Sequence, residues 1–89
     1  MEILVRQISD SELAELRVSA WPLWTKEVSV FEWFYDATEE CYLIHGLVEV
    51  TTSKGKMVVI KAGDFVTFPQ GLACTWKVIE PVKKHYRFG

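Results

Sequence analysis

The sequence predicts an all-β domain, folded as an antiparallel sandwich or barrel. From Val28 to the last residues, apolar and polar side chains alternate in short runs, which is the pattern of half-buried strands. Gly, Pro and Asp interrupt these runs every few residues, as turns do. Only one short segment near the N-terminus carries helix signals. About eight short strands therefore account for most of the chain.

Length and composition limit the chain to one domain and exclude several partners. A chain of 89 residues can bury one core. Its net charge of −2 argues against nucleic acid or an anionic membrane surface as a partner. No apolar run approaches the ~20 residues of a membrane span, and the apolar stretch at the N-terminus is too short for a signal peptide. Two cysteines, Cys41 and Cys74, make no disulfide framework, so we expect a cytoplasmic protein with free thiols.

Residues 1–27 are expected to form a strap and a short helix beside a barrel made by residues 28–89. Ser9 and Glu12 have the spacing of a capping box, which predicts a short helix or turn. Pro22 prevents a longer helix. The Trp-Pro-Leu-Trp segment that contains this proline is expected to lie over the domain as an apolar strap.

The predicted strands follow one another with turns between them. His45-Gly46 and Glu80-Pro81 are interpreted as breaks between strands. Alternation places Glu39, Cys41 and Leu43 on one face of their strand. The strands are expected at residues 3–5, 28–35, 39–44, 47–52, 57–61, 65–68, 74–79 and 82–88.

Two motifs give this pattern a family resemblance. In segment 63–74, Gly, Pro, Gly and Cys stand at the spacing of the second signature motif of the cupins, where a His usually takes the place of Cys74. Glu39, six further residues and Gly46 resemble the end of the first cupin motif. The resemblance implies a single-domain, RmlC-like jelly-roll barrel of two antiparallel sheets, in which both motifs meet at the barrel mouth. Such domains are often homodimers.

Several segments resemble the subfamily related to the cupin domains of ureidoglycine aminohydrolase. They are Trp21-Pro22-Leu23-Trp24, Glu39-Glu40-Cys41-Tyr42, the stretch from Gly63 to Gly71, and Lys84-His85-Tyr86. This resemblance implies metal-assisted hydrolysis of a ureido or amino compound.

The usual histidine ligands of metal-binding cupins are missing. Their positions hold Trp33, Tyr35 and Cys74, and the chain's two histidines lie outside both motifs. We therefore expect no metal cofactor. Glu39 and Cys74 remain an alternative pair of ligands for Mn²⁺ or Zn²⁺, although catalytic zinc sites typically use three protein ligands.

The same positions predict a ligand pocket without a metal. An inward-facing carboxylate at Glu39 needs a partner, because an isolated buried charge is costly. Lys84 is the first candidate, since it shares a strand face with Tyr86 and Phe88, and the Tyr35 hydroxyl is the second. The expected pocket residues are Trp33, Tyr35, Glu39, Cys74, Trp76 and Lys84.

Three functions follow from this reading. The first is a small-molecule-binding cupin whose compact polar ligand carries an amine or urea group. The second is a metal-dependent hydrolase or aminohydrolase, and the third is a non-catalytic structural or regulatory dimer module. Exposed edge strands favour a symmetric homodimer, with the N-terminal segment or the edge strands at the contact.

Overall fold

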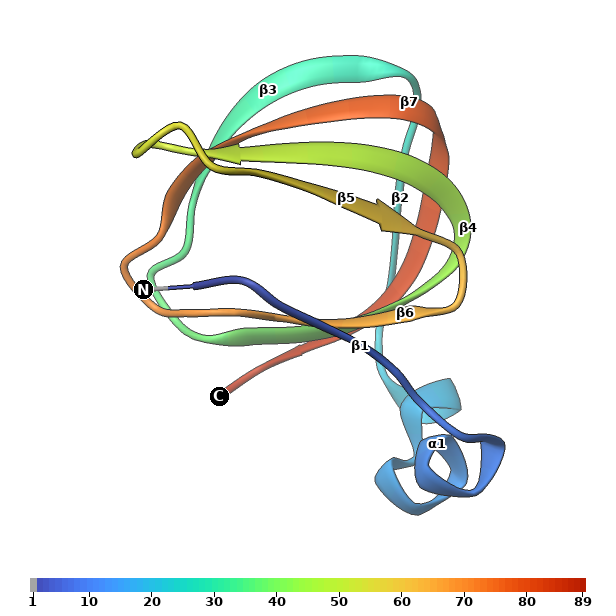
Figure 1. Cartoon of the computed structure of the whole chain (residues 1–89). Coiled ribbons are helices and arrows are strands. Elements are labelled where there is room, and N and C mark those ends of the chain that lie inside the picture. Colours follow the sequence, from blue (N-terminus) through green and yellow to red (C-terminus); the bar gives the residue numbers. More distant parts are fainter. Residues whose placement is uncertain (1) are drawn as a thin grey trace.

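Two long strands form the centre of the barrel in the computed structural model, which describes residues 2–89. Strand β4 (Glu39–Thr52) and strand β7 (Ala73–Phe88) pair antiparallel along almost their whole length. Both strands curve strongly, so each of them contributes to both layers of the barrel (Figure 1).

Shorter strands widen each half of this central pair into a sheet. One layer adds β5 (Met57–Lys61) to β4 and β3 (Ser29–Phe34) to β7. The other layer adds β6 (Asp64–Phe68) to β4, β1 (Leu4–Gln7) to β6, and β2 (Leu23–Lys26) to β7. The predicted class, an all-β antiparallel double-sheet jelly-roll barrel, is confirmed.

The two breaks that the sequence predicted inside these long strands are bends instead. Gly46 has φ +118°, a conformation that side chains rarely adopt, and the pairing of β4 with β7 is irregular between Leu43 and Val48. Pro81 lies in the facing part of β7, where it offers no N–H group to the ladder. The chain absorbs both irregularities as bulges, which bend a strand without ending it.

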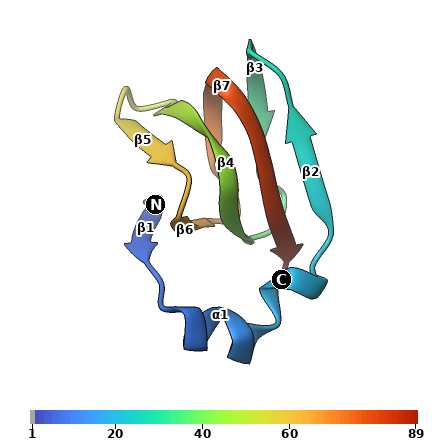
Figure 2. The ribbon, with the colours of Figure 1, turned by 90° about the vertical axis from the view of Figure 1, so that its right-hand side faces the viewer.

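The short N-terminal helix is present as predicted. Helix α1 spans Asp10–Leu16, and the Ser9 hydroxyl caps it by accepting a hydrogen bond from the Glu12 N–H at 3.2 Å. A 3₁₀ turn, η1, follows at Val18–Ala20. The helix lies outside the barrel, at one end of it (Figure 2). No helix in residues 2–89 has the length and apolar character needed to cross a bilayer.

The segment expected to be a strap is a strand. Trp21 is held in an extended conformation (φ −72°, ψ 153°) by the proline that follows it, and β2 continues in that direction. Residues 23–26 pair with residues 82–85 of β7. The apolar strap is therefore an edge strand of the barrel.

The core lies between the two layers and consists of alternate residues from each strand. The face of β4 that carries Glu39, Cys41 and Leu43 is buried, as the alternation predicted. Tyr35 stacks on Phe68 with 4.7 Å between ring centroids, and further aromatic rings continue from this pair. The buried apolar cluster comprises Tyr35, Cys41, Leu43, Val48, Val50, Ile60, Val66, Phe68, Leu72, Cys74, Trp76, Val78 and Val82.

Candidate functional site

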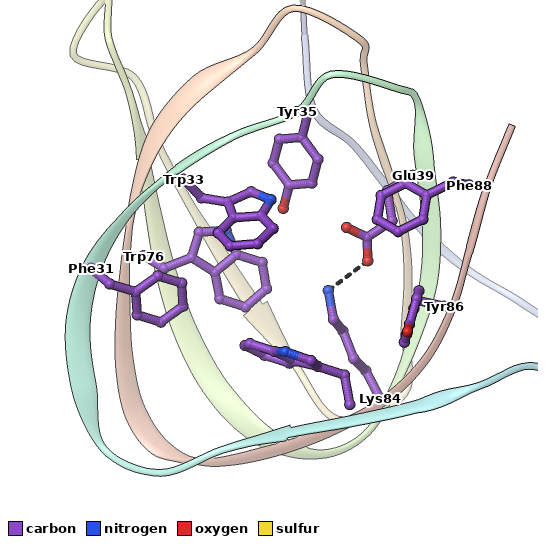
Figure 3. Close-up of a pocket in the computed structure, with 9 residues that line it drawn as sticks. Phe31, Trp33, Tyr35, Glu39, Trp76, Lys84, Tyr86 and Phe88 are labelled. Atoms are coloured by element: carbon purple, nitrogen blue, oxygen red, sulfur yellow. Dashed lines mark hydrogen bonds and ion pairs between the residues drawn. The ribbon is translucent and has the colours of Figure 1, made fainter.

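A cavity of about 180 Å³ opens beside the aromatic part of the core (Figure 3). Two side chains form its exposed rim, Trp33 at 47% and Phe88 at 51% exposure, while the deeper wall is buried or half-buried. The lining residues are Trp24, Phe31, Trp33, Tyr35, Glu39, Trp76, Lys84, Tyr86 and Phe88. The cavity is therefore aromatic apart from one carboxylate, one ammonium group and two hydroxyls.

The two charged groups form a buried ion pair. Lys84 Nζ donates a hydrogen bond to Glu39 Oε2 over 2.6 Å, and the side chains are 6% and 4% exposed. The strand register explains why the two side chains are in contact. Glu39 lies opposite Phe88 in the ladder, and Lys84 lies on the same inward face of β7 as Phe88. The long Lys84 side chain extends along this face to Glu39 (Figure 3). The pair expected from strand-face parity is present. The second candidate partner, the Tyr35 hydroxyl, makes no hydrogen bond to Glu39 in the described chain.

Aromatic faces surround the ammonium group. Lys84 Nζ lies 4.9 Å from the ring centroid of Trp24 and 4.9 Å from that of Trp76. These distances allow cation–π attraction on both sides. An ammonium group has three N–H donors, of which Glu39 takes one. Glu39 Oε1 likewise accepts no hydrogen bond from residues 2–89.

Two further lining side chains carry polar groups, those of Tyr35 and Trp76. Burial, together with the negative charge of Glu39, raises the pKa of the Tyr35 hydroxyl far above its usual value, so this group stays protonated and can donate. The Trp76 Nε1–H is buried and has no hydrogen-bond partner within the described part of the chain. The Tyr35 hydroxyl is therefore the donor that a ligand in the cavity can use, whereas the Trp76 N–H lies beneath the surface of the wall.

Cys74 does not line the cavity that the sequence assigned to it. It points inward, as expected, but Trp76 is the next inward residue of β7, and the larger indole forms the wall. The Cys74 thiol lies in the core, 3.7 Å from the Trp33 carbonyl oxygen. Burial raises the pKa of Cys74 to about 11 and that of Cys41 to about 12. Both thiols are therefore protonated at neutral pH and are poor nucleophiles or ligands.

The donor groups do not fit the metal that many cupins bind. Within residues 2–89, no three or more His, Cys, Asp or Glu side chains come together as a cluster that could hold an ion. Glu39 is the cavity's one carboxylate and already holds the Lys84 ammonium. The alternative pair of Glu39 and Cys74 does not share the cavity. His85 turns Nδ1 to the Trp21 carbonyl oxygen at 2.9 Å and is no part of the lining.

Four lining residues were absent from the predicted site. Phe31 shares the inward face of β3 with Trp33, so strict alternation would have included it. Tyr86 and Phe88 lie on the same face of β7 as Lys84, so the alternation that predicted Lys84 would also have included them. Trp24 gave no such signal, because its segment was not recognised as a strand.

An antiparallel double-layer barrel with a cavity between its layers, carrying the first-motif glutamate on its wall, defines the chain as a cupin. Residues 13–86 match the model of the EutQ-like cupin domain. The chain belongs to this family. The match does not extend to the finer relationship with the ureidoglycine aminohydrolase domains.

Solved structures agree with this assignment. A DUF861 family protein from Thermotoga maritima is 53% identical, with a TM-score of 0.98, and the alignment covers 99% of this chain and 100% of that protein. A protein described as ethanolamine utilization protein Q from Salmonella typhimurium is 17% identical, with a TM-score of 0.68 over 99% of this chain and 69% of its own. The EutQ protein of Clostridium difficile is 18% identical, with a TM-score of 0.69 over 97% and 66%. The last two similarities show the fold alone. No curated protein sequence matches the chain.

Proposed function

We propose that this cupin binds a compact, neutral small molecule in the aromatic cavity, without a metal ion. The observation that carries the proposal is the buried Lys84–Glu39 pair, which borders the cavity with hydrogen-bonding capacity left over on both partners. A structural ion pair alone would be expected to have its remaining donors and acceptors satisfied by the protein.

The wall indicates the chemistry of the ligand. Lys84 and Tyr35 offer donors, which suit a carbonyl oxygen, and Glu39 Oε1 offers an acceptor, which suits an N–H group. The ion pair has no net charge, so a charged ligand would enter an apolar cavity without a free counter-ion. The volume is below the roughly 300–1,000 Å³ of pockets for drug-sized ligands. A primary amide or a urea with a small flat apolar group meets all these requirements.

Tryptophan fluorescence titration with benzamide and phenylurea tests this function. We expect a saturable change in the parent protein, because Trp24 and Trp76 line the cavity. Trp24→Leu should weaken binding by ~10-fold or more through loss of one aromatic wall. Trp21→Leu is the matched control, since Trp21 packs on Phe65 outside the lining and its loss should leave the affinity unchanged.

Two results would contradict the proposal. One is the absence of saturable binding for every amide and urea tried. The other is elemental analysis of the same preparation that finds about one equivalent of Mn or Zn, lost in Glu39→Ala, which would favour a metal-dependent hydrolase related to the ureidoglycine aminohydrolase domains.

We also propose a symmetric homodimer through the outer face of the layer that contains β3 and β5. Val30 and Val59 lie in one cross-strand row with Lys77 and Glu49 between them, and the two valines are 66% and 49% exposed. Such a face is self-complementary, because a two-fold axis can bring Glu49 of one copy to Lys77 of the other.

Light scattering after size-exclusion chromatography checks the assembly. The parent is expected to have the mass of a dimer, and Val30→Lys is expected to give a monomer by placing like charges at the contact. Leu4→Lys, at an exposed position of β1, is the control and should leave the dimer intact. A monomeric parent at high concentration would contradict the proposal, whereas a dimer that binds no amide or urea would favour the structural or regulatory module.

A further inference from the structure

Lys84 differs chemically from every other lysine of the chain. The six others are exposed to solvent: Lys26, Lys54, Lys56, Lys61, Lys77 and Lys83. Lys84 is 5% exposed, borders the cavity and has a carboxylate at hydrogen-bond distance. We propose that Lys84 is a carbonyl-reactive amine, which captures a small aldehyde as a reversible iminium adduct inside the cavity.

The carboxylate can supply the neutral amine that this reaction needs. The Lys84 ammonium and Glu39 Oε2 are 2.6 Å apart, so one proton can pass directly from nitrogen to oxygen. Both side chains are almost entirely buried, at 6% and 4% exposure, and aromatic rings line the cavity around them, so few water molecules can solvate the two charges. A lysine in such a setting is a nucleophile of the kind that forms Schiff bases.

Each bond change in the capture has a named proton donor or acceptor. The lone pair of Lys84 Nζ attacks the carbonyl carbon, the C=O electron pair moves to oxygen, and that oxygen takes the proton held by Glu39. The nitrogen of this carbinolamine then returns a proton to the Glu39 carboxylate. Glu39 protonates the hydroxyl, water leaves, and the nitrogen lone pair forms the C=N bond. Overall, one ammonium and one aldehyde give one iminium and one water, with no change in charge and no oxidant or reductant.

The cavity fits the product as well as the reactant. An iminium carries the same single positive charge as the ammonium, so it keeps its attraction to Glu39 and to the two indole faces at 4.9 Å. The apolar tail of the aldehyde has aromatic side chains to pack against, and the small volume limits that tail to a short chain or one ring. The inference rests on the proposed ligand cavity and adds a covalent step to it.

Reductive trapping with propanal and sodium cyanoborohydride tests the proposal. The parent protein is treated at limiting propanal concentrations, and tandem mass spectrometry of its peptides locates the propyl groups. We expect Lys84 to be labelled at least ~10-fold faster than the exposed lysines, with saturation at higher propanal. Lys83 is the matched internal comparison, since it precedes Lys84 on β7 but faces solvent.

Two variants distinguish the reactivity of the Lys84 amine from the general accessibility of lysines to the reagent. Lys83→Arg should leave the fast labelling unchanged, and Glu39→Gln should slow labelling of Lys84 without changing that of the exposed lysines. Labelling of Lys84 no faster than Lys83 in the parent would overturn the proposal, whatever the stability of the variants. Saturable binding of benzamide or phenylurea together with unlabelled Lys84 would remove only the covalent step, whereas fast labelling without any amide or urea binding would remove only the proposed ligand class.

Discussion

Replacing Lys84 with Met is expected to lower the free energy of unfolding by about 3–5 kcal/mol at neutral pH, because it leaves the Glu39 carboxylate buried without its partner. Met fills most of the same space, so the loss reports the charge rather than a cavity. Urea denaturation monitored by tryptophan fluorescence measures it. Lys83→Met, on the solvent face of the same strand, is the control and should change the value by less than ~0.5 kcal/mol.

A second variant separates a lost partner from lost packing. Lys84→Met combined with Glu39→Leu removes both charges, and replacing a whole buried ion pair with apolar residues is often close to neutral. The double variant should therefore recover most of the stability lost in the single one. Equal stability of Lys84→Met and the parent at neutral pH would show that the pair is not a buried one.

Gly46→Ala is expected to destabilise the barrel by about 2–5 kcal/mol, for two reasons that add. A Cβ atom at Gly46 would lie 2.8 Å from the Pro81 carbonyl oxygen and 2.8 Å from the Val82 Cα atom, both of which belong to the backbone of the facing strand. The φ angle of +118° is also strained for any residue with a side chain. Both central strands would have to shift at their shared bend.

Gly55→Ala is the matched control for this substitution. Gly55 also has a positive φ, +85°, but a Cβ atom there meets nothing within 4 Å. Its substitution therefore reports backbone strain alone, about 1 kcal/mol. Urea denaturation measures the loss in free energy of unfolding for each variant. The difference between the two losses is the cost of placing a methyl group against the backbone at Pro81 and Val82. Equal losses would mean that the strands tolerate the added methyl group.

Period-2 alternation predicted most of the fold and the central contact of the site. It placed Glu39 and Lys84 on inward faces, and the barrel brings those faces together. It could not distinguish a strand that ends from one that bends, because a glycine such as Gly46 or a proline such as Pro81 is common both in turns between strands and in bulges within a strand. It also assigned Cys74 to the cavity. Alternation shows that Cys74 and Trp76 both point inward, but it does not show which of these two side chains is large enough to form the wall.

Trp24 shows a different limit of the sequence. Its strand has only four residues and belongs to the sheet because β7 offers it a free edge, a partner about sixty positions away. Its position over the Lys84 ammonium depends on that pairing and on no local pattern. A residue such as Trp24, which lines the site only because a short edge strand pairs with a distant strand, cannot be predicted from local sequence patterns.

The sharing of β4 and β7 between both layers also restricts how a ligand can enter. Two separate sheets could slide or part to expose what lies between them, but layers built from the same two strands are joined through continuous backbone and cannot separate without breaking the β4–β7 ladder. Access to the cavity therefore falls to side chains at its rim, where Trp33 and Phe88 are half exposed. Rotation of exposed side chains takes picoseconds to nanoseconds, so entry and exit need no slow opening of the barrel.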